Sequence, residues 1–174
     1  MYSINFEEYF NLVNWECIFW GIKEQLLEPN NAIMYANKII ENAPDSDVNE
    51  IIELLITDEA DRDSILVLIE KMFSDKKDLE RKKISALRTL RIILLLEIQK
   101  SITDNQKLLD KIEDIYADFD YPSDMEGFIS YMPAQDNEYD VLNRSSQENQ
   151  QRLINSFKVF MSEELKGISP VENA

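Results

Sequence analysis

The chain has 174 residues, of which 44% are hydrophobic, and its 34 acidic against 18 basic residues give a net charge of −16. This apolar share excludes a disordered chain, and the length suffices for a buried core. With no histidine and only one cysteine, Cys17, the sequence excludes histidine-based catalysis and metal centres, structural zinc sites and internal disulfides. It also contains no GxxxxGK or GxGxxG phosphate-binding loop.

The acidity indicates which partners the chain can bind. A negative surface repels the phosphates of nucleic acids and anionic lipids and attracts basic proteins, although acidity can also serve solubility alone. The longest apolar runs, Ile65–Ile69 and Ile92–Leu96, are far shorter than a membrane crossing. A secretory signal requires basic residues near its start, and here no Lys or Arg precedes Lys23. We expect a cytoplasmic protein that binds neither nucleic acid nor membrane, and that is a monomer or small homo-oligomer when unbound.

The spacing of apolar residues and the scarcity of turn residues predict an all-α fold. Three glycines and five prolines are too few for the turns of a many-stranded sheet. In the first half of the chain we predict helices over 15–27, 32–42, 48–56 and 63–73. Asn14 is the expected N-cap of the first of these helices, and Asp47 with Glu50 forms a capping arrangement at the third.

The second half begins with the longest predicted helix, over 77–101, whose "RIILLLEI" segment is apolar on nearly every side. Such a helix is typical of the middle of a bundle. Two capping boxes, Thr103 with Gln106 and Ser145 with Glu148, predict helices over 105–117 and 145–166. The residues of the last helix that we expect to face inward are Leu153, Ile154, Phe157, Phe160, Met161 and Leu165.

The predicted helices favour a single all-helical domain over 1–174. We expect an irregular bundle of about seven or eight helices, in which some helix pairs resemble those of an α-solenoid, although no sequence repeat recurs at a fixed period. The tail over 168–174 is expected to be frayed.

A proline-bracketed segment, "YPSDMEGFISYMP" over Tyr121–Pro133, interrupts the long helices. Ser123 and Glu126 form another capping box, which predicts a short helix. Gly127 weakens such a helix by roughly 1 kcal/mol, and a close approach of another helix or of a partner would explain it. The apolar residues of the segment share one predicted buried stripe: Met125, Phe128, Ile129 and Met132.

Charge is segregated along the chain. Residues 1–70 carry fifteen acids and three bases, residues 71–91 carry eight bases and three acids, and residues 112–143 carry nine acids and no Lys or Arg. The bases of the middle segment are spread around their helix rather than aligned on one face. We therefore expect them to neutralise neighbouring acidic helices instead of binding nucleic acid.

The acidic run is the candidate partner-binding surface, because tyrosines are interleaved with its acids. Aromatic anchors amid charge are typical of protein interfaces. In the alternative interpretation the tyrosines pack on the core and the acids are merely solvated. The candidate residues are Asp118, Asp120, Tyr121, Asp124, Glu126, Tyr131, Asp136, Glu138, Tyr139 and Asp140.

Carboxylate chemistry is the enzymatic alternative. Glu50 with Glu53, and Asp110 with Glu113, stand one helical turn apart, like the Mg²⁺ ligands of all-helical nucleotide hydrolases. Acids at this spacing are more common on solvated helix faces. We therefore predict no catalytic residue, no metal site and no cofactor.

Two stretches, "NWECIFWGIKEQLL" and "DFDYPSDMEGFISYMP", resemble a group of small acidic bacterial proteins of unknown function. Members of such groups look like immunity proteins, encoded beside polymorphic or contact-dependent toxins. The resemblance implies a cognate toxin as partner and no enzymatic activity, and it supplies no binding residues. We expect a non-enzymatic immunity protein that occludes a basic toxin; the alternatives are a carboxylate- and magnesium-dependent hydrolase, or an adaptor or regulatory protein with another basic partner.

Overall fold

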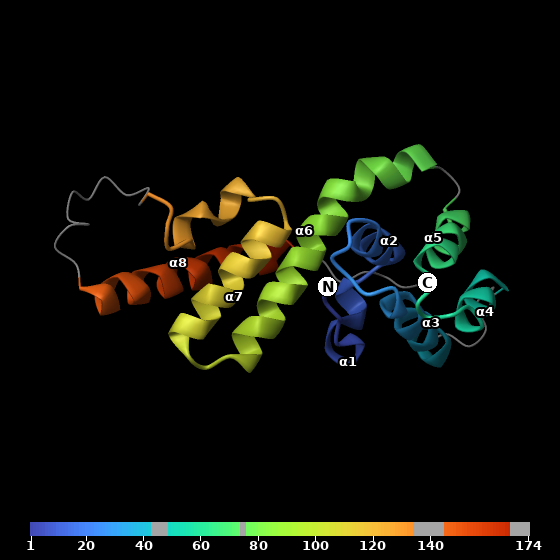
Figure 1. Ribbon diagram of the computed structural model, residues 1–174, viewed down its shortest axis with the longest axis horizontal. Helices are drawn as coiled ribbons and strands as arrows, with labels where there is room; N and C mark the ends of the chain where they lie inside the picture. The colour runs from blue at the N-terminus through green and yellow to red at the C-terminus, as the bar shows by residue number, and fades with distance from the viewer. Residues whose placement is uncertain (43–48, 74–75, 134–144, 168–174) are drawn as a thin grey trace. The chain divides into compact units, whose positions relative to one another are not determined.

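The computed structural model describes residues 1–42, 49–73, 76–133 and 145–167 (Figure 1). Its fold is all-α, as the sequence predicts, and the one extended pairing within these ranges is an isolated parallel bridge between Tyr2 and Leu27. No helix in the described ranges combines the length and apolarity needed to cross a membrane. Asp47 and the expected frayed tail lie outside the described residues.

The contacts group the chain into two compact units, the first formed mainly by Met1–Ile93 and the second by Leu94–Ile168. Because compact units can belong to one domain, the single domain over 1–174 stays a prediction. The helices of the first unit are α1 (Phe6–Tyr9), η1 (Phe10–Leu12), α2 (Trp15–Lys23), α3 (Asn30–Asn42), α4 (Asn49–Leu55), α5 (Arg62–Lys71) and the first part of α6 (Lys76–Ser101).

Helix α2 is the centre of the first unit, with α3 and α5 packed against it. Asn14 caps α2 as predicted, because its side chain accepts a hydrogen bond of 2.9 Å from the Cys17 N–H. The buried Trp20 indole donates to the Leu79 carbonyl at 3.1 Å and so fastens α6 to α2. A Cβ added at Gly21 would lie 2.6 Å from Leu27 Cδ1, so this close packing depends on glycine.

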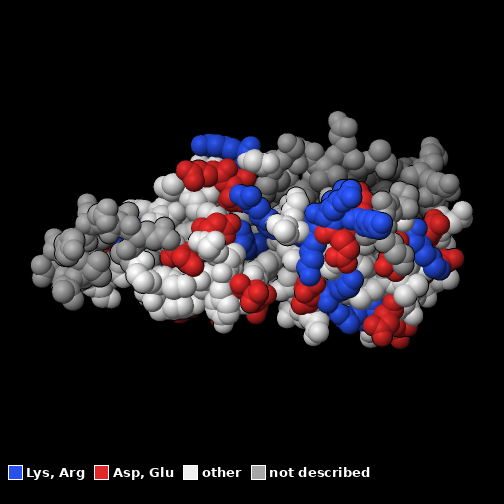
Figure 2. Space-filling view, turned by 90° about the horizontal axis from the view of Figure 1, so that it is seen from above, with Lys and Arg blue, Asp and Glu red and all other residues white. Residues whose placement is uncertain are grey.

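Two lysines in the basic first half of α6 are paired with an acid of α2 and with the acidic C-cap of that helix. Lys82 Nζ lies 2.9 Å from Glu16 and Lys83 Nζ lies 2.6 Å from Glu24, while Lys83 also lies over the Trp20 ring at 4.7 Å. On the face drawn in Figure 2, basic side chains of this unit have acidic side chains directly beside them. These pairs confirm the prediction that bases of this helix neutralise a neighbouring acidic helix.

The second unit comprises the rest of α6, α7 (Asn105–Asp118), the 3₁₀ helix η2 (Ser123–Phe128) and α8 (Ser146–Gly167). Both α7 and η2 pack against α8 (Figure 1). The capping box of α8 is confirmed: the Ser145 N–H donates to Glu148 at 2.8 Å, and the Glu148 N–H donates to the Ser145 hydroxyl at 3.3 Å. The apolar segment of α6 is buried as predicted at Ile92, Ile93, Leu94 and Leu95.

The predicted capping box of α7 is wrong. Asp104 is the N-cap and accepts from the Lys107 N–H at 2.9 Å. The Gln106 side chain, which the box needs, instead donates to Asp110 one turn further along the helix at 2.8 Å. A carboxylate directly before the first helical residue is a strong N-cap, so Thr103 is displaced from that position.

The predicted helix within Tyr121–Pro133 is the 3₁₀ helix η2, and no side chain caps it. Met125 N–H donates to the Pro122 carbonyl at 3.0 Å, an i→i+3 bond. This winding brings residues three apart onto one side, and it buries Met125 and Phe128 together. The close helix approach proposed for Gly127 is absent, because a Cβ there meets no described atom within 4 Å.

The inward stripe of α8 is mostly confirmed. Leu153, Ile154, Phe157 and Met161 are buried, whereas Phe160 is only half-buried. Leu165 is 42% exposed, so its predicted inward position is wrong. It lies in the last turn of α8.

Candidate functional site

The turn after α7 is closed by backbone hydrogen bonds. The Asp120 N–H donates to the Ala117 carbonyl at 3.1 Å, and the Tyr121 N–H donates to the Tyr116 carbonyl at 3.0 Å. This pattern is a Schellman motif, in which glycine normally occupies the left-handed position. Here Asp120 and Tyr121 occupy left-handed backbone positions in succession, with φ of 60° and 57°. Non-glycine residues pay about 1–2 kcal/mol for this conformation, so the turn stores backbone strain.

The strained turn places Tyr121 in a cluster with two other tyrosines. The Tyr121 ring meets the Tyr116 ring edge-on at a centroid distance of 5.3 Å, and the Tyr131 ring lies 6.4 Å from Tyr116. We call Tyr116, Tyr121 and Tyr131 the tyrosine cluster. Tyr116 is fully buried, whereas Tyr121 is 58% and Tyr131 60% exposed. Large exposed aromatic rings on a buried aromatic base are typical of protein-binding surfaces.

The Tyr116 hydroxyl is buried and has no hydrogen-bond partner in the described part of the chain. Burial raises the pKa of Tyr116, and the nearby charge of Glu126 raises it further. The hydroxyl is therefore protonated at neutral pH and keeps both a donor and an acceptor function.

Two carboxylates lie around the tyrosine cluster. Glu113 accepts a hydrogen bond of 3.0 Å from the Ser130 N–H, which fastens the residue before Tyr131 to α7. Burial raises the pKa of Tyr131, and Glu113 raises it further. With Glu126 acting on Tyr116, the cluster lies in a negative local field that favours a cation.

The structure brings together the described members of the predicted site. Asp118 ends α7, Asp120 and Tyr121 form the turn, and Asp124 and Glu126 lie in η2. We call the six described candidates the acid–tyrosine surface: Asp118, Asp120, Tyr121, Asp124, Glu126 and Tyr131. All are exposed except Glu126, which is half-buried. The other four candidates lie outside the described residues: Asp136, Glu138, Tyr139 and Asp140.

Sequence reasoning missed two residues of this site. Neither Tyr116 nor Glu113 is among the predicted partner-binding residues, and Glu113 enters the prediction only as part of a carboxylate pair and of the acidic run. Their spacing of three residues puts them on one helix face, which is the signal that sequence offers. The contact between Glu113 and Ser130 joins residues 17 apart and has no local signal.

A family model described as an uncharacterized protein conserved in bacteria (DUF2247) matches residues 4–165. The chain belongs to this family. The match includes the whole tyrosine cluster, and it confirms the resemblance to bacterial proteins of unknown function. Neither the search of curated proteins nor the search of solved structures finds a match.

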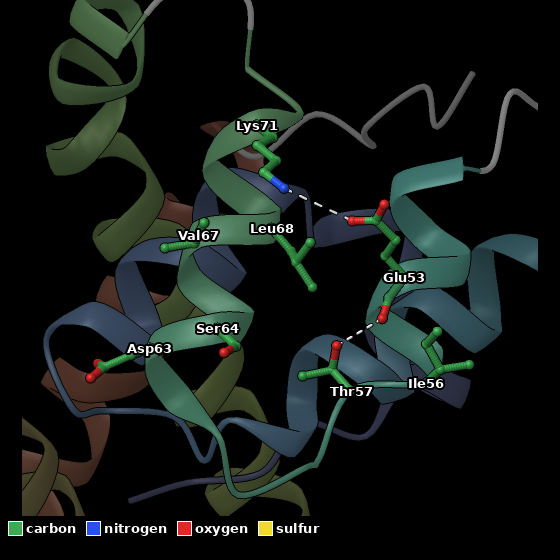
Figure 3. Close-up of a pocket in the computed structure, with 8 residues that line it drawn as sticks. All are labelled: Glu53, Ile56, Thr57, Asp63, Ser64, Val67, Leu68 and Lys71. Carbon is green, nitrogen blue, oxygen red and sulfur yellow. Dashed lines mark hydrogen bonds and ion pairs between the residues drawn. The ribbon is translucent and has the colours of Figure 1, made fainter.

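The first unit of this DUF2247 chain has a separate open groove of about 600 Å³ between α4 and α5 (Figure 3). Its polar groups already contact one another: Lys71 Nζ lies 3.9 Å from the Glu53 carboxylate, and the Thr57 hydroxyl donates to the Glu53 carbonyl at 2.7 Å. With both signs of charge among its ionisable residues, the groove favours no ligand charge. Its lining residues are Glu53, Ile56, Thr57, Asp63, Ser64, Val67, Leu68 and Lys71.

The carboxylate pairs considered for metal binding have other contacts in the DUF2247 chain. Asp110 accepts from Gln106, Glu113 accepts from Ser130, and Glu53 is paired with Lys71. In the described ranges, no three His, Cys, Asp or Glu side chains gather as metal ligands. Burial raises the pKa of the Cys17 thiol to about 12, so this cysteine is not a thiolate at neutral pH.

Proposed function

We propose that this chain is a non-enzymatic binding protein whose acid–tyrosine surface holds a basic protein, and that this partner is a cognate toxin. The observation that carries the proposal is the tyrosine cluster: two exposed rings on a buried third, flanked by carboxylates. Residues 112–143 contain no Lys or Arg to neutralise these acids from within the segment. A toxin is the partner that the resemblance implies, and membership of a bacterial family of unknown function is consistent with it.

The proposed mechanism is occlusion. The carboxylates steer the basic surface of the toxin toward this face, which raises the association rate by about 10- to 1,000-fold at low salt. The exposed rings of Tyr121 and Tyr131 then hold the docked partner, because aromatic side chains bury a large area at low entropic cost. A toxin that uses its basic surface to bind phosphates loses that surface to the acidic protein.

The test uses the basic proteins encoded beside the gene as candidate partners. We expect a stoichiometric complex at low salt, measured by calorimetry and pulldown. A triple variant, Asp120→Lys, Asp124→Lys and Glu126→Lys, is expected to slow association by about 10-fold or more while circular dichroism and thermal unfolding stay unchanged.

The matched control changes three exposed acids of the first unit, Glu28→Lys, Glu50→Lys and Glu59→Lys. Both triple variants alter the net charge equally, so a difference between them reports the location of the binding surface. The proposal is wrong if no complex forms at low salt, and the acid–tyrosine surface is not the interface if both triple variants bind alike.

A further inference from the structure

The buried hydroxyl of Tyr116 has no hydrogen-bond partner among the described residues. Buried polar groups nearly always have a hydrogen-bond partner, so an exception calls for an explanation. The other fully buried tyrosine among the largest core side chains, Tyr35, follows the rule and donates to the Val13 carbonyl at 2.9 Å. The Tyr116 hydroxyl oxygen keeps free acceptor capacity in the described part of the chain.

The side chains that pack on the Tyr116 ring can move. Tyr121 and Tyr131 pack on the Tyr116 ring, yet each is more than half exposed. Exposed side chains change rotamer on the picosecond-to-nanosecond timescale. Either ring can therefore move aside without any movement of the helices.

The chemistry around the hydroxyl selects a cation that also donates hydrogen bonds. The faces of aromatic rings attract cations, and the carboxylates of Glu113 and Glu126 add a negative field. A guanidinium fits better than an ammonium, because it is planar, stacks on rings, is weakly hydrated and presents several N–H donors.

We propose that the tyrosine cluster is the receptor for an arginine side chain of the partner, whose guanidinium stacks on Tyr121 and Tyr131 and donates a hydrogen bond to the Tyr116 hydroxyl oxygen. This assignment rests on the proposed function and specifies which side chain of the basic partner binds the tyrosine cluster. Glu113 and Glu126 balance the positive charge of the guanidinium. The left-handed turn at Asp120 and Tyr121 fixes the backbone position from which the Tyr121 ring extends.

The first experiment uses short capped peptides as probes: Gly-Arg-Gly, Gly-Lys-Gly and the uncharged citrulline analogue. Tyrosine ring resonances of the isotope-labelled full chain are followed by NMR at low salt and assigned with Tyr→Phe variants. We expect saturable shifts of the cluster resonances with the arginine peptide, weaker shifts with lysine and none with citrulline. Equal shifts with arginine and lysine would overturn the choice of guanidinium.

The second experiment separates binding from folding through Tyr116→Phe, which removes only the hydroxyl. We expect it to weaken the arginine peptide roughly tenfold, as loss of a hydrogen bond to a charged group does. Because the hydroxyl has no described partner, its removal should leave the free energy of unfolding unchanged or higher. Tyr35→Phe is the reverse control, since it should lower stability and leave peptide binding intact.

Failure of this inference is distinguishable from failure of the proposed function. If Tyr116→Phe binds the arginine peptide and the basic protein partner as tightly as the unchanged chain, the arginine receptor is wrong. Even then, the proposed function stands if the triple lysine variant no longer binds the basic protein partner. If no basic protein binds at all, the function fails regardless of the peptide result.

Discussion

The two buried tyrosines at the centre of aromatic clusters, Tyr35 in the first unit and Tyr116 in the second, differ in what surrounds them. Tyr35 is packed against Phe6, Phe10 and Trp15, with centroid distances between 4.8 and 5.6 Å, and its hydroxyl is hydrogen-bonded. The rings of two exposed tyrosines pack on the Tyr116 ring, and the Tyr116 hydroxyl has no described partner. The first cluster is fully packed and hydrogen-bonded, while the second has two exposed rings and a buried hydroxyl with no partner among the described residues.

The distribution of charged residues also differs between the first unit and the acidic run over 112–143. In the first unit, Lys82 and Lys83 are paired with acids of α2. In the acidic run over 112–143 the sequence provides no base at all. The base that precedes this run, Lys111, lies 2.7 Å from Asp114, so the contrast in charge concerns the composition of the two segments.

The largest expected difference comes from truncating one ring in each cluster. Tyr35→Ala is expected to lower the free energy of unfolding by about 3–5 kcal/mol, because it opens a cavity among buried rings and removes a hydrogen bond. Tyr131→Ala should cost less than about 1 kcal/mol, since that ring is mostly exposed. Chemical denaturation measures both, and equal losses would contradict the contrast between the clusters.

The next largest effect compares a glycine of each unit. Gly21→Ala is expected to lower the free energy of unfolding by about 1–3 kcal/mol, because its Cβ would lie 2.6 Å from Leu27 Cδ1 and 3.0 Å from Leu90 Cδ2. Gly127→Ala should be neutral or raise stability by about 0.4–1 kcal/mol, because its Cβ meets no described atom within 4 Å. Thermal unfolding of the two variants tests the pair, and a large loss from Gly127→Ala would show a close contact at that position.

A subtler comparison removes only the hydroxyl groups. Tyr35→Phe is expected to lower the free energy of unfolding by about 1–2 kcal/mol, because it leaves the buried Val13 carbonyl without this donor. Tyr116→Phe is expected to cost nothing or to stabilise the chain. Denaturant titrations of both variants provide the measurement, and a comparable loss at Tyr116 would show that its hydroxyl is already satisfied.

The smallest effect concerns the strained turn. Asp120→Gly is expected to raise the free energy of unfolding by up to about 1 kcal/mol, because glycine adopts the left-handed conformation without a steric penalty. The control, Asp118→Gly within α7, should lower it by about half a kcal/mol. Thermal unfolding compares the two, and a loss at position 120 would mean that the turn is not strained there.

Much of the fold was predictable because its signals are local. The apolar periodicity predicts the long helix α6 to within one residue at its start, and the N-cap role of Asn14 depends on a residue three positions away. A local sequence signal gives a wrong prediction where a neighbouring residue or another helix type competes with it. Asp104 caps α7 in place of Thr103, and η2 is a 3₁₀ helix although its sequence contains a capping box.

The sequence predicted which exposed residue types form the candidate site, but it did not predict the buried residue on which the exposed rings pack. The interleaving of acids with Tyr121 and Tyr131 indicated the surface, because charge and residue type are visible in any stretch of sequence. The role of Tyr116 beneath them was not visible, since a tyrosine in a buried helical stripe has the same pattern whether or not its hydroxyl is satisfied.

The sequence by itself determined the all-α class, the main helices and the segregation of charge, because each depends on residues within a few turns of one another. Only the tertiary structure decided which lysines pair with the acids of α2 and its C-cap, which rings meet at Tyr116, and which buried hydroxyl has no partner among the described residues. These features depend on contacts between residues distant in the chain and on the exact direction of single polar atoms. Helical periodicity specifies the buried face, but it leaves the hydrogen bonds on that face open.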